Sequence, residues 1–354
     1  MTMTLTLRDL LIHTIEKKGS DLHINTGLPP QVRIDGKLTP IGDSPLSPEQ
    51  AKELCYECLN QEQVMHFETE RSIDLSFQIE GHSRFRANIF WALDTVCAAF
   101  RPIPLQIPTP DTLGIPASVL NLINKPRGLV LVTGQTGSGK STTLASMLEQ
   151  INQNSHEHII TIEDPIEYLF TQKKSLINQR EIGRDAHGFS QALRYILRQD
   201  PDVVLIGEMR DLETIQSAIT VAETGHLVFA TLHTNSAVQS VDRIIDVFPP
   251  HHQNQVRTQL SFMLEGVVSQ QLLPKIGGGR TLAMEILLPN SGIRNLIREG
   301  KTHQIAAQMQ MGQQHSDMVM MDQSLAKLVK AGIVDHDEAR RAAINVEDFN
   351  SYML

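Results

Sequence analysis

One short stretch limits what this chain can fold into more than any other part of its sequence. The segment Gly-Gln-Thr-Gly-Ser-Gly-Lys-Ser, residues 134–141, directly follows the apolar run 129–132 and one threonine. Its pattern, G-x-x-x-x-G-K-S, is that of the phosphate-binding P-loop, in which a strand ends in a glycine-rich turn and a helix begins. Glycines let the backbone curl so that its N–H groups converge on an anion, and the amino end of the helix adds positive potential. The motif predicts an α/β fold with a parallel sheet.

The P-loop assigns chemical roles to its own residues. We predict that Lys140 reaches the β- and γ-phosphates of ATP and that the Ser141 hydroxyl serves Mg²⁺, so the predicted cofactors are ATP and Mg²⁺. A glycine-rich turn without a ligand is the alternative, but the preceding strand, the spacing and the composition all favour the P-loop. The residues expected to contact the nucleotide are Gly134, Gln135, Thr136, Gly137, Ser138, Gly139, Lys140, Ser141 and Thr142.

Two further apolar runs end in acidic residues. Residues 159–162 lead into Glu163, and residues 203–206 lead, after one glycine, into Glu208. Ligands of open α/β sheets bind outside the carboxyl ends of the strands. We therefore predict that Glu163 polarises the attacking water and that Glu208 is the Walker B acid of the Mg²⁺ shell. An ion pair with Arg210 alone is the alternative for Glu208.

A third apolar run, residues 227–232, lies between two histidines. His226 precedes it, and His233 follows it at the expected carboxyl end of the strand. A single histidine is more often a structural group than a functional one. The position of His233 favours sensing of the γ-phosphate or a link to the next subunit, although spacing alone leaves both interpretations open.

The charge, the apolar runs and the cysteine content of the whole chain limit the classes of protein to which it can belong. The net charge of −9 gives no general attraction to nucleic acid. No apolar run approaches the roughly 18–20 residues that span a bilayer, and the amino terminus lacks a basic region followed by an apolar core. We therefore expect no transmembrane segment and no signal peptide. Three cysteines fit a reducing compartment, in agreement with cytosolic ATP.

The 354 residues suggest two domains. Residues 1–101 alternate a helix with antiparallel strands, which is typical of a small α+β domain. Residues 102–116 contain five prolines, which exclude a helix or central strand and favour a stiff linker. Residues 117–290 carry the α/β pattern, and residues 291–354 are expected to be helical.

The first domain offers two sets of candidate residues. Arg84 and Arg86 lie two apart on a predicted strand and so face the same side, and Arg101 follows another strand. They are either solvated or act as arginine fingers on the nucleotide of a neighbouring subunit. Cys55 and Cys58 form one C-x-x-C, for which structural helix thiols are favoured over a redox pair or a metal site.

Four motifs together carry a family resemblance. They are the P-loop 134–141, the acidic box 161–167, the segment 207–211 and the histidine box 224–235. Their types and order resemble the type II/type IV secretion ATPases, and the resemblance covers nearly the whole chain. Residues 292–301, Gly-Ile-Arg-Asn-Leu-Ile-Arg-Glu-Gly-Lys, are similar to the Ala-Ile-Arg-Asn-Leu-Ile-Arg-Glu motif of the pilus-retraction members, with glycine in place of the first alanine. Trp91 departs from them and is more like the accessory retraction ATPases.

The resemblance implies an architecture and an activity. It implies a PAS-like N-terminal domain, a RecA-like ATPase core and a C-terminal helical segment, assembled as a homohexamer that hydrolyses ATP to retract type IV pili in twitching motility. It implies that His226 and His233 couple the nucleotide to the subunit contact, with His226 among the nucleotide-binding residues and Lys140, Glu163, Glu208 and His233 among the catalytic ones. Arg84, Arg86 and Arg101 would approach ATP in trans.

The resemblance also implies partners and a location. The expected partners are a PilC-type platform protein of the inner membrane and a PilU-type accessory ATPase, with the chain peripheral to the cytoplasmic face of that membrane. A PilU-like accessory role is one alternative. A RecA-like nucleic-acid motor is the other, but the net charge of −9 and the 5% aromatic content argue against it, and no nucleic-acid partner is expected.

Overall fold

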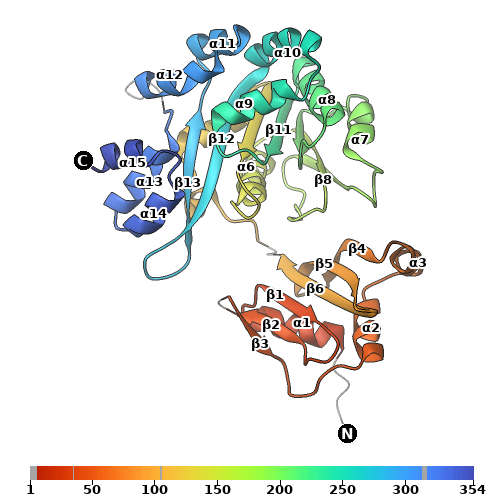
Figure 1. Cartoon of the computed structure of the whole chain (residues 1–354). Helices are drawn as coiled ribbons and strands as arrows, with labels where there is room; N and C mark the ends of the chain where they lie inside the picture. The colour runs from red at the N-terminus through yellow and green to blue at the C-terminus, as the bar shows by residue number, and fades with distance from the viewer. Residues whose placement is uncertain (1–5, 35, 104–105, 313–316) are drawn as a thin grey trace. The chain divides into compact units, whose positions relative to one another are not determined.

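The computed structural model describes residues 6–34, 36–103, 106–312 and 317–354 (Figure 1). The chain divides into two compact units. The first is Met1–Gln106 with Glu167–Leu169, and the second is Ile107–Ile166 with Phe170–Leu354. The expected domain boundary at residue 101 falls within a strand that continues to Ile103.

The first unit is an α+β fold built on a six-stranded sheet with the order β3-β2-β1-β6-β5-β4. Neighbouring strands pair antiparallel throughout. Apolar side chains of alternate strand residues, such as Phe85, Ala87 and Ile89, enter a core shared with the helices. The elements are α1 (Leu7–Glu16), β1 (Asp21–Ile24), β2 (Gln31–Ile34), β3 (Lys37–Pro40), α2 (Pro48–Tyr56), α3 (Gln61–Glu70), β4 (Ser72–Ile79), β5 (Ser83–Ala92) and β6 (Thr95–Ile103).

The C-x-x-C segment, whose two thiols were expected to lie on one helix, contains the end of a helix and the turn after it. Helix α2 has Ser47 as its N-cap and Pro48 in its first turn, and it ends at Tyr56. Helix α3 was not predicted because its sequence is polar on nearly every face, and a capping box between Asn60 and Gln63 starts it.

The two thiols of the C-x-x-C lie at the end of α2 and in the turn after it. Cys55 is fully buried and Cys58 is half-buried. Burial raises the pKa of both thiols, that of Cys58 to about 12, so neither is a thiolate at neutral pH. Among the described residues no group of three or more His, Cys, Asp or Glu side chains is placed to hold a metal ion. The favoured structural interpretation fits these observations.

The proline-rich segment contains a short helix, which corrects the expectation that it has none. Helix α4 (Pro110–Leu113) begins with a proline at its first position, capped by the Thr109 side chain. Proline is well tolerated there because the missing N–H would have no helical partner and its φ is already helical. Proline 104 of the predicted linker lies outside the described residues.

The second unit is built on a seven-stranded sheet with the order β13-β12-β7-β11-β10-β8-β9. All neighbours are parallel except β12 and β13. One strand, β11, lies between the P-loop strand β7 and the Walker B strand β10. The elements are α5 (Ala117–Leu120), η1 (Asn121–Asn124), β7 (Gly128–Thr133), α6 (Lys140–Asn154), β8 (His158–Glu163), β9 (Leu176–Glu181), α7 (Phe189–Ile196), β10 (Val203–Ile206), α8 (Leu212–Glu223), β11 (Leu227–Leu232), α9 (Ala237–Asp246), α10 (Pro250–Met263), β12 (Leu264–Pro274) and β13 (Arg280–Leu287).

Two apolar cores cover the two faces of this sheet. Alternate residues of β7, such as Val130 and Val132, pack with α6 residues such as Leu144 and Leu148. The intervening residues Leu129 and Leu131 face the other core, to which α7, α8, α9, α10 and α11 contribute. The β7, β8, β10 and β11 strands are therefore buried on both faces, which explains their continuous apolar runs.

The C-terminal segment is helical, as predicted. Helices α13, α14 and α15 share a small core with β12 and β13, in which Met321, Leu325 and Phe349 are buried. Asp335 caps α14, and its side chain accepts from the N–H groups of Asp337 and Glu338. The elements, blue in Figure 1, are α11 (Ser291–Arg298), η2 (Thr302–Gln304), α12 (Ile305–Gly312), α13 (Met321–Lys330), α14 (His336–Ala342) and α15 (Val346–Met353).

Candidate nucleotide-hydrolysis site

The predicted site residues of the second unit follow four neighbouring parallel strands at their carboxyl ends. The strands β8, β10, β11 and β7 are adjacent in that order. Their ends lie within two residues of one another: Ile206, the last residue of β10, pairs with Ile162 and with Ala230, and Leu232 pairs with Thr133. Glu163, Glu208, His233 and Gly134 come at or just after these strand ends, so the fold brings all four to one edge of the sheet.

The P-loop has the backbone that its glycines predict. Gly134, Gly137 and Gly139 have φ values of 141°, 81° and 91°, a region that other residues rarely adopt. A Cβ atom on Gly134 would lie 2.4 Å from the Gln270 carbonyl oxygen and 2.6 Å from Ser138 Oγ. The loop therefore needs glycine at this position both for its φ and for its close approach to β12.

The loop and the helix after it present hydrogen-bond donors. Helix α6 begins at Lys140, and its N-cap residue Gly139 has no side chain to cap the amino end of the helix. Lys140 Nζ donates to the carbonyl oxygens of Gly134 at 2.8 Å and Gln135 at 3.0 Å. Ser138 Oγ is buried and has no hydrogen-bond partner among the described residues. These donors suit a polyphosphate.

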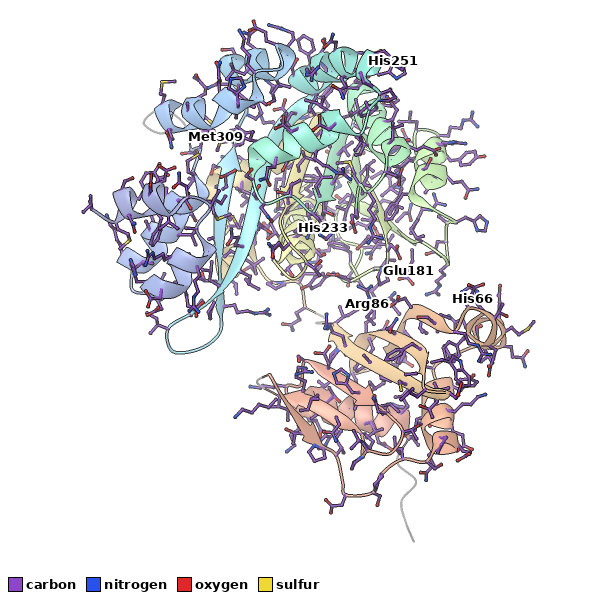
Figure 2. The ribbon with its side chains drawn as sticks, in the orientation of Figure 1. His66, Arg86, Glu181, His233, His251 and Met309 are labelled. Carbon is purple, nitrogen blue, oxygen red and sulfur yellow. The ribbon has the colours of Figure 1, made fainter. Side chains whose placement is uncertain are left out.

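Glu208 is held as a carboxylate by two basic side chains. Its Oε2 lies 2.7 Å from Arg210 and its Oε1 lies 3.0 Å from Nε2 of His233. Burial acts to raise the pKa of Glu208, but the hydrogen bonds and charges of Arg210 and His233 outweigh it, and the net pKa is lowered. Glu208 therefore makes the ion pair with Arg210 and also contacts His233, which follows β11 at this edge of the sheet. Figure 2 labels His233.

Glu163 has two neighbours that the sequence patterns did not reveal. Thr161 Oγ1 donates to Glu163 Oε1 at 2.7 Å, and Gln179 Nε2 donates to the same oxygen at 3.3 Å. Thr161 lies two residues before Glu163 on β8, and Gln179 lies opposite Thr161 on β9. Gln179 could be found from the sequence only if β9 were predicted first. Strand β9 is a polar edge strand and lacks the apolar run that marks its neighbours.

His226 is not brought to this edge of the sheet in its own chain. It comes directly before β11, whose first residue, Leu227, pairs with Gly128 at the start of β7. A six-residue strand spans about 20 Å, so His226 lies at the opposite edge of the sheet from the P-loop of its own chain. Its Nδ1 instead lies 3.0 Å from the Val221 carbonyl oxygen.

The three arginines lie on the outer face of the first unit's sheet, opposite the apolar core. Arg84 is only 7% exposed and donates to Ser76, whereas the side chain of Arg86 is 43% exposed. Arg101 lies within β6 rather than after it, directly opposite Arg86. Its side chain is 69% exposed and pairs with Asp21 at 2.8 Å. Arg86 and Arg101 are therefore the exposed members of the three, and Arg84 is the buried one.

The donor set fits Mg²⁺-bound ATP. The curled glycine loop, the Lys140 ammonium and the amino end of α6 suit the phosphates. Ser141 and Glu208 offer a hydroxyl and an ionised carboxylate, the oxygen ligands that Mg²⁺ prefers.

Comparisons with known proteins agree with this site. Residues 114–278 match the family model described as type II/IV secretion system protein. The chain is 48% identical over 343 residues to the type IV pilus retraction ATPase PilT of Pseudomonas aeruginosa, covering 97% of this chain and 99% of that protein. The chain belongs to the PilT family of type II/IV secretion ATPases. It is an ATPase and binds a nucleotide.

A solved structure and a second relative place the chain within the family. A crystal structure of the pilus retraction motor PilT with bound ADP superposes with a TM-score of 0.92 at 49% identity, over 98% of this chain and 99% of that one. The type IV pilus ATPase PilU of Pseudomonas aeruginosa is 40% identical over 96% of this chain and 89% of its own. Within the part of the chain that the structure describes, no helix is both long and apolar enough to cross a bilayer.

Proposed function

We propose that this chain is a hexameric motor ATPase that drives type IV pilus retraction. The observation that carries the proposal is a P-loop aligned with two carboxylates at one sheet edge, in a chain similar to PilT over nearly its whole length. The α11 helix carries the segment similar to the retraction motif and supports the retraction branch. Its expected partners are further copies of itself, an inner-membrane platform protein of the PilC type and a PilU-type ATPase.

The side chains have distinct tasks in this proposal. When ATP binds, Lys140 exchanges the loop carbonyls for the β- and γ-phosphate oxygens. Ser141 and Glu208 would hold Mg²⁺, which supplies neutralisation of phosphate charge when bound. Glu163 orients a water molecule and accepts its proton as the water oxygen bonds to the γ-phosphorus. The bond from that phosphorus to the bridging oxygen breaks, and ADP and phosphate result.

Two other groups complete the proposed site. Arg86 or Arg101 of a neighbouring subunit stabilises the charge on the transferring phosphoryl group. His233 contacts Glu208 directly, so a change at the phosphates reaches the loop after β11 through one carboxylate. The chain would act at the cytoplasmic face of the inner membrane, where ATP is available and the platform protein is exposed.

The test combines ATP turnover with a pilus assay. We expect the purified chain to hydrolyse ATP with no stimulation by DNA, and cells lacking the chain to be hyperpiliated and unable to twitch. Expression of the wild-type chain should restore twitching, and expression of Glu163→Gln should not. Strong stimulation by DNA, or normal twitching in the deletion strain, would contradict the proposal.

A second candidate is an accessory, PilU-like role, which the Trp91 residue favours. Trp91 stacks on Phe67 with ring centroids 6.2 Å apart, and Arg71 lies 4.8 Å from the Trp91 ring. The same deletion strain separates the two roles. We expect loss of a retraction motor to abolish twitching, whereas loss of an accessory ATPase would leave the main motor in place and twitching would continue.

A further inference from the structure

Two side chains hold the carboxylate of Glu163 in one orientation. Thr161 is fully buried, and its hydroxyl donates to Glu163 Oε1 at 2.7 Å. The Gln179 amide nitrogen donates to the same oxygen at 3.3 Å. The two bonds differ in length, so the hydroxyl is the stronger donor and the amide the weaker one.

The strand register explains why the three side chains meet. Thr161 and Glu163 are two residues apart on β8 and therefore point to the same face of the sheet. Thr161 pairs with Gln179 in the parallel register of β8 and β9, so Gln179 faces that side as well. Ile159 belongs to the core shared with the P-loop helix α6. By the same two-residue alternation, Glu163 faces the α6 side of the sheet.

The orientation of the Gln179 amide is itself fixed. Its Oε1 accepts a hydrogen bond from the Phe170 N–H at 2.9 Å. An N–H group needs an acceptor, so the oxygen of the amide must face Phe170 and the nitrogen must face Glu163. Gln179 therefore presents a donor, not an acceptor, to the carboxylate.

We propose that Thr161 and Gln179 are positioning residues for the proposed general base Glu163, so this inference rests on the catalytic role proposed above. Both donors bind Oε1, and each carboxylate oxygen accepts about two hydrogen bonds. The paired donors limit rotation of the carboxylate and so fix the direction in which Glu163 accepts the proton of the attacking water.

The experiment measures kcat and KM for ATP in Thr161→Val and Gln179→Leu. General-base catalysis contributes about 100- to 10,000-fold, so loss of orientation should lower kcat by about 10- to 100-fold for Thr161→Val and less for Gln179→Leu. KM should change little, because neither residue is placed at the phosphates. Thr161→Ser keeps the hydroxyl and should recover most of the wild-type kcat.

A double-mutant cycle separates positioning from a structural role. In a Glu163→Gln background the carboxylate is gone, so Thr161→Val should cause no further loss of the residual turnover. The matched control is Gln172→Leu, since the Gln172 side chain binds the backbone of Ile177 at the start of β9 and has no contact with Glu163. It should lower the melting temperature and keep kcat.

Each outcome decides the inference. An unchanged kcat in Thr161→Val, or an equal loss with and without the Glu163 carboxylate, would overturn the positioning role. A kcat loss in Gln172→Leu equal to that in Gln179→Leu would show that β9 stability alone is responsible. Near-wild-type turnover in Glu163→Gln would instead overturn the proposed role of Glu163 itself.

Discussion

Lys140 lies among the carbonyl oxygens of its own loop, bonded to Gly134 and Gln135. The same ammonium is the group that meets the β- and γ-phosphates in a P-loop. We expect Lys140→Ala to lower the rate of ATP hydrolysis by at least about 100-fold, the scale of losing one donor to the developing charge. A steady-state phosphate-release assay measures this. Turnover near the wild-type rate would mean that the loop is not the phosphate site.

A second single residue, Glu285, gives a prediction about how the stability of the fold depends on pH. It is buried in β13, and its carboxylate accepts from the N–H groups of Ala237 at 2.6 Å and Met321 at 3.4 Å. Burial raises the pKa of Glu285 despite these two bonds. The folded state therefore retains the proton to higher pH than the unfolded state does, and the contribution of Glu285 to stability falls as pH rises from about 4 through the raised pKa.

Glu285→Gln removes this titration and keeps an oxygen acceptor. We expect the difference in melting temperature, wild type minus variant, to be largest at acid pH and to decrease as pH rises. Thermal melts of both proteins in matched buffers measure that difference. A difference that stays constant across the pH range would contradict the prediction.

Helix α11 gives a prediction at the scale of elements. Arg294 belongs to the segment that resembles the retraction motif, and the structure gives this side chain three contacts outside α11. Its guanidinium donates to the carbonyls of Ser261 and Phe262 in the last turn of α10, at 2.9 and 3.0 Å, and to Glu265 at 2.9 Å. These carbonyls have no helical partners of their own. Arg294 thus fastens α11 to α10 and to the start of β12.

We expect Arg294→Ala to destabilise the second unit by about 1–3 kcal/mol, the range for hydrogen bonds to charged groups. Arg298→Ala is the matched control, because Arg298 lies on the same helix, is exposed, and donates to its neighbour Asn295. Thermal unfolding of the two variants measures the difference. Equal stability would show that the Arg294 contacts contribute nothing net.

The elements also show why some of the fold was predictable. Strands β10 and β11 were predicted to the residue because they are buried on both faces and so have unbroken apolar runs. Edge strand β9 was missed because only its Ile177 and Glu181 are buried. Motifs located Glu163 and Glu208, but the positions of Gln179 and His226 depend on strand register and direction, which no local pattern contains.

At the scale of the whole molecule, the two units carry complementary parts of the proposed site. The P-loop, Glu163 and Glu208 belong to the second unit, and the exposed Arg86 and Arg101 belong to the first. In a closed ring every subunit presents the same surfaces to its neighbours. If the arginine acts in trans, a chain without its own P-loop lysine still completes the site of the next chain.

Subunit mixing tests this directly. Lys140→Ala and Arg86→Ala should each be inactive alone. Rings co-assembled from equal amounts of the two variants should recover up to about a quarter of wild-type turnover. The reason is that about a quarter of the sites then combine an intact P-loop with a neighbour's intact arginine. Co-assembly of Lys140→Ala with Glu163→Gln is the control, because both residues belong to the same unit and no mixed ring restores a site. If Arg86 acted within its own chain, the first mixture would stay as inactive as the second. The same pair of mixtures made with Arg101→Ala identifies which of the two exposed arginines reaches the phosphates.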